Sequence, residues 1–235
     1  MLKYLNAIKE LLFPNVCFYC EDKIQNGILC KNCREKIEFL YPPVCRFCSK
    51  PLEKNKTLIC KDCQNKEYPY DRLISVASYK EPLISLLYLF KYKNYYYIGD
   101  FLSSIIIEYL LKIGFNLYDY DFIIPVPLHP VRLKEREYNQ SFILARFISN
   151  YFKMELKDDI IYKIKDTVSQ TKLKGSKRIE NIKNTFMIKN HNIKNKKVII
   201  IDDVFTTGST LYECSRVLKE NNHFNITLIT LCKTL

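Results

Sequence analysis

The residues with the most distinctive chemistry lie between positions 196 and 211, where an apolar run precedes two acids and a hydroxyl-rich loop. Residues 198–201 are wholly apolar, which is typical of a strand buried on both faces of a parallel sheet, so we expect a central strand. Asp202 and Asp203 come next, at the carboxyl end where ligands bind in open α/β sheets, and their carboxylates can accept hydrogen bonds from vicinal hydroxyls or hold a hydrated Mg²⁺. The loop that follows combines hydroxyls with a flexible glycine and opens a helix whose N–H groups attract phosphate; it comprises Thr206, Thr207, Gly208, Ser209 and Thr210. The pattern predicts a ligand that carries a diol and a phosphate on one sugar.

The alternative interpretation of this stretch is a strand, turn and helix without a ligand. Adjacent aspartates also follow strands in folds with other chemistry. A sugar-phosphate site requires the acids, the hydroxyls and the glycine to occur in this order, and they do. We therefore favour the ligand site.

Eight of the ten cysteines form four Cys-x2-Cys pairs before residue 64. Each pair has the spacing of a zinc knuckle, and a tetrahedral Zn²⁺ site needs two pairs. The simplest assignment is two all-thiolate sites in sequence order, and an interleaved pairing stays open. The eight predicted ligands are Cys17, Cys20, Cys30, Cys33, Cys45, Cys48, Cys60 and Cys63. A disulfide framework or a redox role is the alternative, but no secretory signal is recognisable before these residues, which favours structural zinc.

The chain of 235 residues carries a formal net charge of +12, and the excess is concentrated in two segments. Residues 163–197 hold eleven Lys or Arg against two acids, and residues 1–66 hold twelve against seven. Such a field attracts pyrophosphate, nucleotides or nucleic acid. A solvated basic loop that binds nothing is the alternative.

Between these motifs the apolar periodicity predicts alternating strands and helices. Strands are expected at 73–78, 122–126, 198–201 and 226–231, and helices at 82–91, 98–111, 140–152 and 210–221. The alternation predicts an α/β fold with a mainly parallel sheet. We divide the chain into residues 1–66, a docking helix at 2–13 followed by a double zinc ribbon, and residues 67–235, the α/β domain. The most apolar stretch, 105–113, is interrupted by Glu108 and Lys112 and is too short to span a membrane.

Residues 202–210 resemble the phosphoribosyl-pyrophosphate (PRPP) loop of type I phosphoribosyltransferases. In that family the two acids face the ribose 2′ and 3′ hydroxyls and the Thr/Gly loop cradles the 5′-phosphate, so Val204 and Phe205 are implied to belong to the binding segment. Residues 123–140, Thr167-Val-Ser-Gln-Thr and Arg178-x2-Asn181, in order with the zinc pairs and the loop, are similar to the ComF family of bacterial DNA-uptake (competence) proteins. Glu137 departs from this family, which usually has Gly at that position of an Arg-Gly-Phe-Asn-Gln motif. The local turn geometry is therefore in question.

The resemblance implies further site residues. The loop after the strand at 122–126 contacts pyrophosphate in related phosphoribosyltransferases, and it maps onto residues 128–132, with Leu128 and His129 as the implied ligand-binding residues. A mobile loop that closes over the ligand maps onto 166–185, with Gln170 and Arg178 as its working members, because Arg holds phosphate oxygens bidentately. Asp202, Asp203 and Arg178 would be the catalytic groups, and Mg²⁺ would be bound with PRPP.

Simpler roles remain open for several of these residues. Arg132 and Arg136 are either pyrophosphate ligands or ordinary surface residues of a helix, and Gln170 either binds or only caps a turn. The aromatic run at 88–97, with Lys91 and Lys93, combines core packing with a candidate stacking surface for bases at its 91–97 end.

The family resemblance implies a PRPP-binding, phosphoribosyltransferase-like protein of DNA uptake and natural transformation. The zinc module and the basic stretch would contact single-stranded DNA, other DNA-uptake proteins such as a helicase are implied partners, and the expected location is the cytoplasm or the inner face of its membrane. The alternative is a phosphoribosyltransferase with an unidentified small acceptor and no DNA role. Turnover and sensing of PRPP are both open, and Thr206 stands where purine-salvage relatives often have an acid, which argues against purine salvage.

Overall fold

The computed structural model describes residues 15–53, 58–166, 184–189, 194–222 and 224–235. The predicted N-terminal helix at 2–13 lies outside these residues. At the centre is a five-stranded parallel sheet in the order β1-β7-β6-β2-β3. Its strands are β1 (Arg72–Ser78), β7 (Asn225–Lys233), β6 (Lys197–Phe205), β2 (Phe122–Pro125) and β3 (Glu155–Leu156). The parallel α/β fold expected from the sequence is confirmed.

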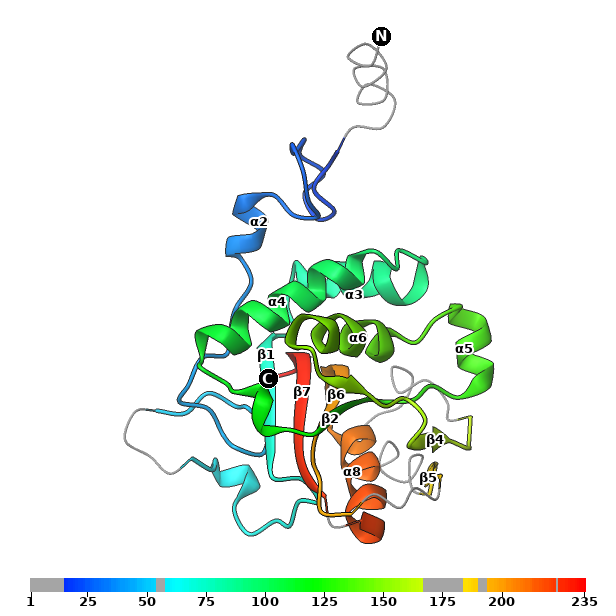
Figure 1. The fold of residues 1–235 in the computed structure, drawn as a ribbon. Coiled ribbons are helices and arrows are strands. Elements are labelled where there is room, and N and C mark those ends of the chain that lie inside the picture. The colour runs from blue at the N-terminus through cyan, green and yellow to red at the C-terminus, as the bar shows by residue number, and fades with distance from the viewer. Residues whose placement is uncertain (1–14, 54–57, 167–183, 190–193, 223) are drawn as a thin grey trace.

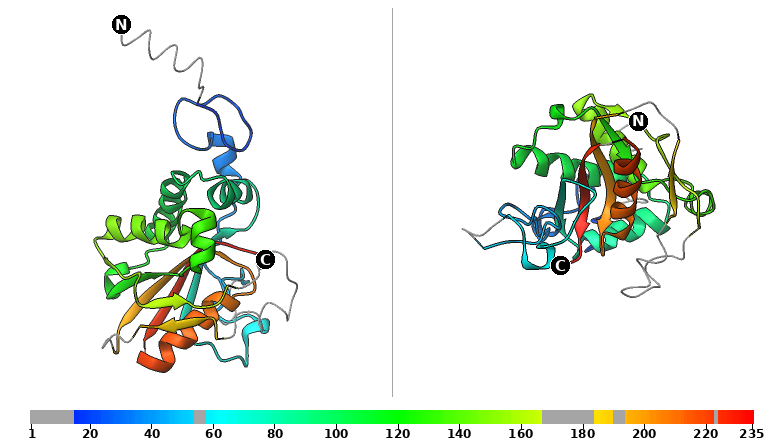
Figure 2. Two further views of the ribbon diagram at one scale, coloured as in Figure 1. Left: turned by 90° about the vertical axis from the view of Figure 1, so that its right-hand side faces the viewer. Right: turned by 90° about the horizontal axis from the view of Figure 1, so that it is seen from below.

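Helices cover both faces of the sheet (Figures 1 and 2). On one face lie α3 (Leu83–Tyr92), α4 (Ile98–Lys112) and α6 (Gln140–Phe152), and on the other lies α8 (Ser209–Asn222). The shorter elements are α2 (Lys31–Glu35), η1 (Lys61–Cys63), η2 (Leu117–Asp119), α5 (Pro130–Arg136) and an antiparallel pair, β4 (Ile161–Lys163) with β5 (Phe186–Ile188). No helix in the described part of the chain is long and apolar enough to cross a membrane.

β6 is the strand that positions the candidate site. It occupies the middle of the sheet and continues beyond the predicted run of 198–201, because β7 pairs with it as far as Phe205 opposite Lys233. Asp202 and Asp203 therefore lie within the strand and not after it. Since side chains alternate along a strand, Ile199 and Ile201 pack with α3, α4 and α6 in one core, whereas the side chains of 198 and 200 pack with α8 in the other.

The N-terminal cysteine-rich part is attached to the outer edge of β1. Leu40 N–H donates to the Val76 carbonyl at 2.9 Å, Ser78 N–H to Glu38 at 2.8 Å and Leu73 N–H to Arg46 at 2.8 Å. These bonds satisfy backbone groups on a strand edge that would otherwise be open for association with another chain. The boundary near residue 66 stays a prediction.

Gly99 is required by close helix packing. A Cβ atom at this position of α4 would lie 2.5 Å from Cγ2 of Ile143 on α6 and 3.0 Å from the Phe90 ring on α3. Alanine is ordinarily favoured over glycine within a helix by up to about 1 kcal/mol, but Ile143 is a stiff, β-branched core residue. The clash should outweigh the helix propensity.

We expect Gly99→Ala to lower the free energy of unfolding by about 1–2 kcal/mol, because overpacking forces buried side chains off their rotamers. Urea denaturation measures this change. Leu111→Ala is the control, because Leu111 is exposed on the same helix, and it should change stability by no more than about 0.5 kcal/mol. A Gly99→Ala protein as stable as the wild type would contradict the packing argument.

Candidate functional site

Asp202 and Asp203 are consecutive residues near the carboxyl end of β6. The two carboxyl groups are engaged by different helices: Asp203 pairs with Lys91 of α3, and Asp202 accepts a hydrogen bond from Ser141 at the start of α6. The backbone N–H of Asp203 donates to Oδ1 of Asp202 at 2.9 Å. Two adjacent carboxylates are thus held at the edge of the sheet where α/β folds bind their ligands.

Asp202 is held by Ser141 at the start of α6. The Ser141 hydroxyl donates to Oδ1 of Asp202 at 2.8 Å. Burial, and then the like charge of Asp203, raise the pKa of Asp202 to about 7, against the opposing effects of Lys91 and of this hydrogen bond. The carboxyl group of Asp202 therefore changes charge near neutral pH.

Lys91 pairs with Asp203. Its Nζ lies 2.7 Å from Oδ2 of Asp203, and the two side chains are only 19% and 11% exposed. Burial opposes the charged form of Lys91, but the carboxylate of Asp203 outweighs it and raises the lysine pKa. The sequence suggests Lys91 as part of a stacking surface for bases, whereas the structure places its ammonium group in the candidate site. No local motif signals this pairing, because helix and strand are far apart in sequence.

The hydroxyl loop turns sharply between β6 and α8. Gly208 has φ +77°, and a Cβ there would lie 2.4 Å from the Phe205 ring, so both conformation and space require glycine. The Thr207 and Ser209 hydroxyls lie 2.9 Å apart, and Ser209 begins a helix of fourteen residues. A loop of hydroxyls and backbone N–H groups at the start of a long helix is suited to an anion.

The proposed pyrophosphate side is formed by the chain after β2. Leu128 and His129 are half-buried, and Nδ1 of His129 accepts a hydrogen bond from Val131 N–H at 3.3 Å as the N-cap of α5. Arg132 is engaged by two acids, with Nη1 2.7 Å from Glu135 and Nε 3.2 Å from Asp166. The described contacts therefore give His129 and Arg132 local structural roles.

Two further residues shape the chain between α5 and α6, Glu137 through its backbone and Gln140 through its buried amide. Glu137 has φ 65°, which explains why glycine suits this position, and its carboxylate accepts a bond from Asn94 at 3.0 Å. Gln140 is buried, its Oε1 accepts from Arg136 at 3.2 Å, and its Nε2 has no hydrogen-bond partner among the described residues. A buried donor beside Ser141 is a group that a polar ligand would satisfy. The sequence gives no signal for Ser141, whereas Gln140 ends the family motif at 136–140 without a predicted role.

Two predicted site residues, Gln170 and Arg178, lie outside the described residues, together with most of the basic stretch. Among the described residues, the site thus comprises the β6 carboxylates, Lys91, Ser141, Gln140 and the loop at 206–210.

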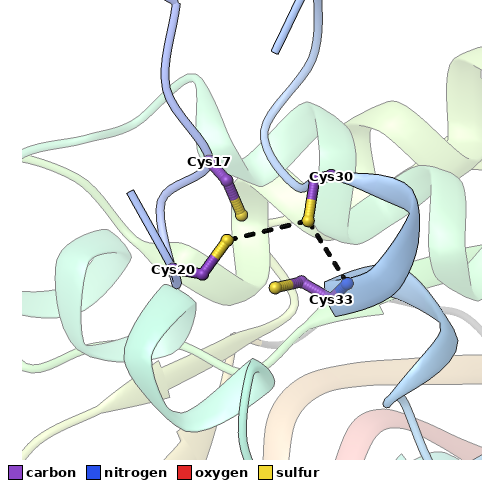
Figure 3. A group of neighbouring side chains, drawn as sticks. All are labelled: Cys17, Cys20, Cys30 and Cys33. Atoms are coloured by element: carbon purple, nitrogen blue, oxygen red, sulfur yellow. Dashed lines mark hydrogen bonds between the residues drawn. The ribbon is translucent and has the colours of Figure 1, made fainter. Parts of the chain in front are cut away.

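The eight N-terminal cysteines form two separate clusters, and the pairing follows sequence order. One contains Cys17, Cys20, Cys30 and Cys33 (Figure 3), and the other contains Cys45, Cys48, Cys60 and Cys63. The four Sγ atoms of each cluster lie within 4.8 Å of one another. Four thiolates at about 2.3 Å from a tetrahedral Zn²⁺ are roughly 3.8 Å apart, so both clusters fit structural zinc. The interleaved pairing is wrong.

The protein backbone favours thiolate in both clusters. Cys60 N–H donates to Sγ of Cys45 at 3.3 Å, and Cys33 N–H to Sγ of Cys30 at 3.4 Å. Burial opposes ionisation of Cys17, but hydrogen bonds from backbone N–H groups, that of Cys20 foremost, outweigh it and lower the Cys17 pKa to about 6. Thiolate is the form that binds a metal ion.

Comparison with known proteins covers both parts of the chain. A family model of the double zinc ribbon domain matches residues 8–64, and a model of the phosphoribosyl transferase domain matches residues 139–235. Competence protein F of Haemophilus influenzae is 31% identical over 213 residues, which cover 87% of this chain and 90% of that protein. DNA utilization protein YhgH of Shigella flexneri is 30% identical over 224 residues, covering 88% and 97%. Among solved structures, a purine phosphoribosyltransferase from Pyrococcus horikoshii aligns over 58% of this chain and 82% of that chain, with 18% identity and a TM-score of 0.35.

We expect the protein to contain close to two zinc ions per chain, because each cluster completes one tetrahedral site. Metal analysis after purification without added zinc measures this content. Cys45→Ser should reduce it to about one ion, whereas Cys214→Ala, at a buried cysteine outside both clusters, should leave two. A zinc content near zero with disulfides detected by mass spectrometry would contradict the assignment.

The raised pKa of Asp202 predicts a pH-dependent loss of stability. Its folded-state pKa of about 7 lies above the value of about 3.9 in an unfolded chain, so between these values the native state holds a proton that the unfolded state releases. The contribution of Asp202 to the free energy of unfolding is therefore fully present below about pH 4 and is lost as the pH rises through 7. In magnesium-free buffer, Asp202→Asn should therefore gain stability relative to the wild type as the pH increases from 5 to 8, measured by urea denaturation. A stability difference that does not change with pH would rule out the shift.

Proposed function

Because the chain belongs to the ComF family of competence proteins, we propose that it binds PRPP and acts in DNA uptake and natural transformation. The observation that carries the proposal is the position of Asp202 and Asp203 at the carboxyl end of the central strand, directly before the Gly208 loop and the start of α8. A diol site and a phosphate site would thereby stand on one strand–loop–helix unit, as binding of one sugar phosphate requires.

The described residues suggest a division of tasks around PRPP. Asp202 would accept a hydrogen bond from one ribose hydroxyl through Oδ2, because Oδ1 already accepts from Ser141. Asp203 would accept a hydrogen bond from the neighbouring hydroxyl while its Oδ2 remains paired with Lys91. The loop at 206–210 would donate its hydroxyl and N–H groups to the 5′-phosphate. Mg²⁺, bound with the pyrophosphate oxygens, would neutralise the negative charge of the leaving group.

A transfer reaction would require the site to stabilise charge separation between an oxocarbenium-like ribose and departing pyrophosphate. Leu128, His129 and Gln170 are proposed to contact the pyrophosphate side, and Arg178 is proposed to hold its oxygens. Nε2 of Gln140 offers a further buried donor. If no acceptor reacts, the same contacts make the protein a PRPP sensor.

The DNA role rests on the relatives and on charge. The relatives carry the names of competence and DNA utilization proteins, and the basic excess of this chain suits single-stranded DNA. We propose that the protein works on the cytoplasmic side with other DNA-uptake proteins, such as a helicase. The second candidate is a phosphoribosyltransferase for a small acceptor without a DNA role, which the phosphoribosyl transferase domain match favours.

We expect Asp202→Asn with Asp203→Asn to lower the affinity for PRPP and Mg²⁺ by roughly 100-fold or more, since each hydrogen bond to a charged group contributes about 1.5–3 kcal/mol. Isothermal calorimetry measures the affinity. Asp100→Asn with Asp158→Asn is the matched control, because it makes the same charge change at two exposed acids. Unchanged affinity in the first variant would sink the assignment.

Two additions keep this experiment interpretable. Asp203→Asn leaves the ammonium group of Lys91 without its carboxylate, so Asp203→Asn with Lys91→Met tests the site without an unpaired buried charge. Pyrophosphate release from PRPP, measured with and without single-stranded DNA and in a product search, separates transfer from sensing.

A further inference from the structure

Five tyrosines are exposed along the end of α3 and the loop that leads to α4. Tyr88, Tyr92 and Tyr96 are 51%, 49% and 64% exposed, and Tyr95 and Tyr97 are exposed as well. The opposite side of α3 is buried in the core through Leu83, Leu86, Leu87 and Phe90. Core packing therefore accounts for the aliphatic residues and Phe90 of this segment but not for its tyrosines. We call Tyr88, Tyr92, Tyr95, Tyr96 and Tyr97 the tyrosine face.

The rings of the tyrosine face form two contacting groups, Tyr88 with Tyr92 on α3 and Tyr95, Tyr96 and Tyr97 in the loop that follows. The centroids of Tyr88 and Tyr92 are 5.6 Å apart, those of Tyr95 and Tyr97 are 5.7 Å apart, and Tyr96 lies 6.1 Å from Tyr97. Phe18, from the first zinc cluster segment, packs edge-on against Tyr95 at 5.7 Å. Partly ordered rings lose less conformational entropy when a ligand stacks on them.

Cationic groups border the tyrosine face. The Arg136 guanidinium lies 5.2 Å from the Tyr92 ring centroid, and Lys93 is exposed directly after α3. Glu137 is the adjacent acid, and its carboxylate already accepts a hydrogen bond from Asn94. The surface thus combines positive charge with aromatic rings that carry hydroxyl groups. A partner with bases and phosphates fits this surface better than an apolar protein partner does.

The tyrosine face also adjoins the candidate PRPP site. Lys91, one residue before Tyr92, pairs with Asp203. Arg136 contacts both the Tyr92 ring and Oε1 of Gln140, and Gln140 precedes the Ser141 that binds Asp202. A ligand on Tyr92 would therefore share neighbours with a ligand on the β6 carboxylates.

We propose that the tyrosine face is the binding surface for single-stranded nucleic acid, with bases stacked on Tyr88, Tyr92 and Tyr96 and phosphates near Lys93 and Arg136. This inference rests on the proposed DNA role and gives it a location. Stacking on aromatic rings tolerates any base sequence, because every base has a flat aromatic face. Because α3 carries both Tyr92 and the Lys91 that pairs with Asp203, and Arg136 contacts both Tyr92 and Gln140, binding of PRPP and of the strand should be coupled, and each would then change the other's affinity by the same factor.

The absence of tryptophan from this chain makes the surface directly testable. Tyr96→Trp introduces a single fluorescent reporter into the face, and a stacked base should quench it in a saturable way when an oligothymidylate is added. Tyr118→Trp is the matched control, because Tyr118 is 76% exposed but lies just before the amino end of β2, away from the site. Quenching of both reporters alike, or of neither, would overturn the proposed location.

Affinity variants give the second readout. Tyr92→Leu with Tyr96→Leu should weaken oligothymidylate binding, measured by fluorescence anisotropy, by about ten-fold or more, whereas Tyr92→Phe with Tyr96→Phe should bind like the wild type because the rings remain. Tyr118→Leu with Tyr151→Leu, at two exposed tyrosines elsewhere, should also bind like the wild type. Circular dichroism and zinc content check that each variant is folded.

The outcomes separate this inference from the proposed function. Normal oligothymidylate binding by the leucine variant would refute the tyrosine face and leave the DNA role in place. No oligothymidylate binding by the wild type would refute both, and PRPP calorimetry would then stand alone. Light scattering gives the third outcome. If the wild type is a dimer, and Tyr92→Leu with Tyr96→Leu makes it monomeric without changing DNA binding, the face would be assigned to self-association instead.

Discussion

Two carboxylates on consecutive residues of a buried central strand form the constraint around which this protein is organised. Burial and mutual repulsion both disfavour the charged pair, and the raised pKa of Asp202 expresses this cost. The protein compensates from two directions, with Lys91 of α3 on Asp203 and Ser141 of α6 on Asp202. The placement of these two helices on the sheet, including the close contact at Gly99, therefore determines the electrostatics of the site.

The same constraint explains which parts of the site were visible in the sequence. β6, the acids and the Gly208 loop are contiguous, so their order alone indicates a strand, a ligand edge and a phosphate loop. The cysteine pairs were equally local, although their pairing required the structure. The roles of Lys91 and Ser141 were not predictable, because each reaches a carboxylate through tertiary packing and has no local signature. Gln140 closes the family motif at 136–140, but the burial of its Nε2 is visible only in the fold.

The differences between the predicted and the observed secondary structure also arise from tertiary pairing. β6 extends past its apolar run because pairing with β7 satisfies its backbone, whatever the side chains at 202 and 203. β3, β4 and β5 are two or three residues long and carry too little periodicity to be recognised. Glu137 was identified as a departure from the family, and its left-handed backbone, stabilised in part by Asn94, shows how a residue other than glycine is accommodated.

The central claim is that the end of β6 and the Gly208 loop bind a sugar phosphate, and phosphorus NMR tests it most directly because PRPP carries its own reporters. On addition of equimolar protein to PRPP and Mg²⁺, the 5′-phosphate and pyrophosphate resonances should shift or broaden together, since the loop and the pyrophosphate side are proposed to bind opposite ends of one ligand. Appearance of free pyrophosphate over time would add turnover to binding. Resonances that match those of PRPP and Mg²⁺ alone would contradict the account.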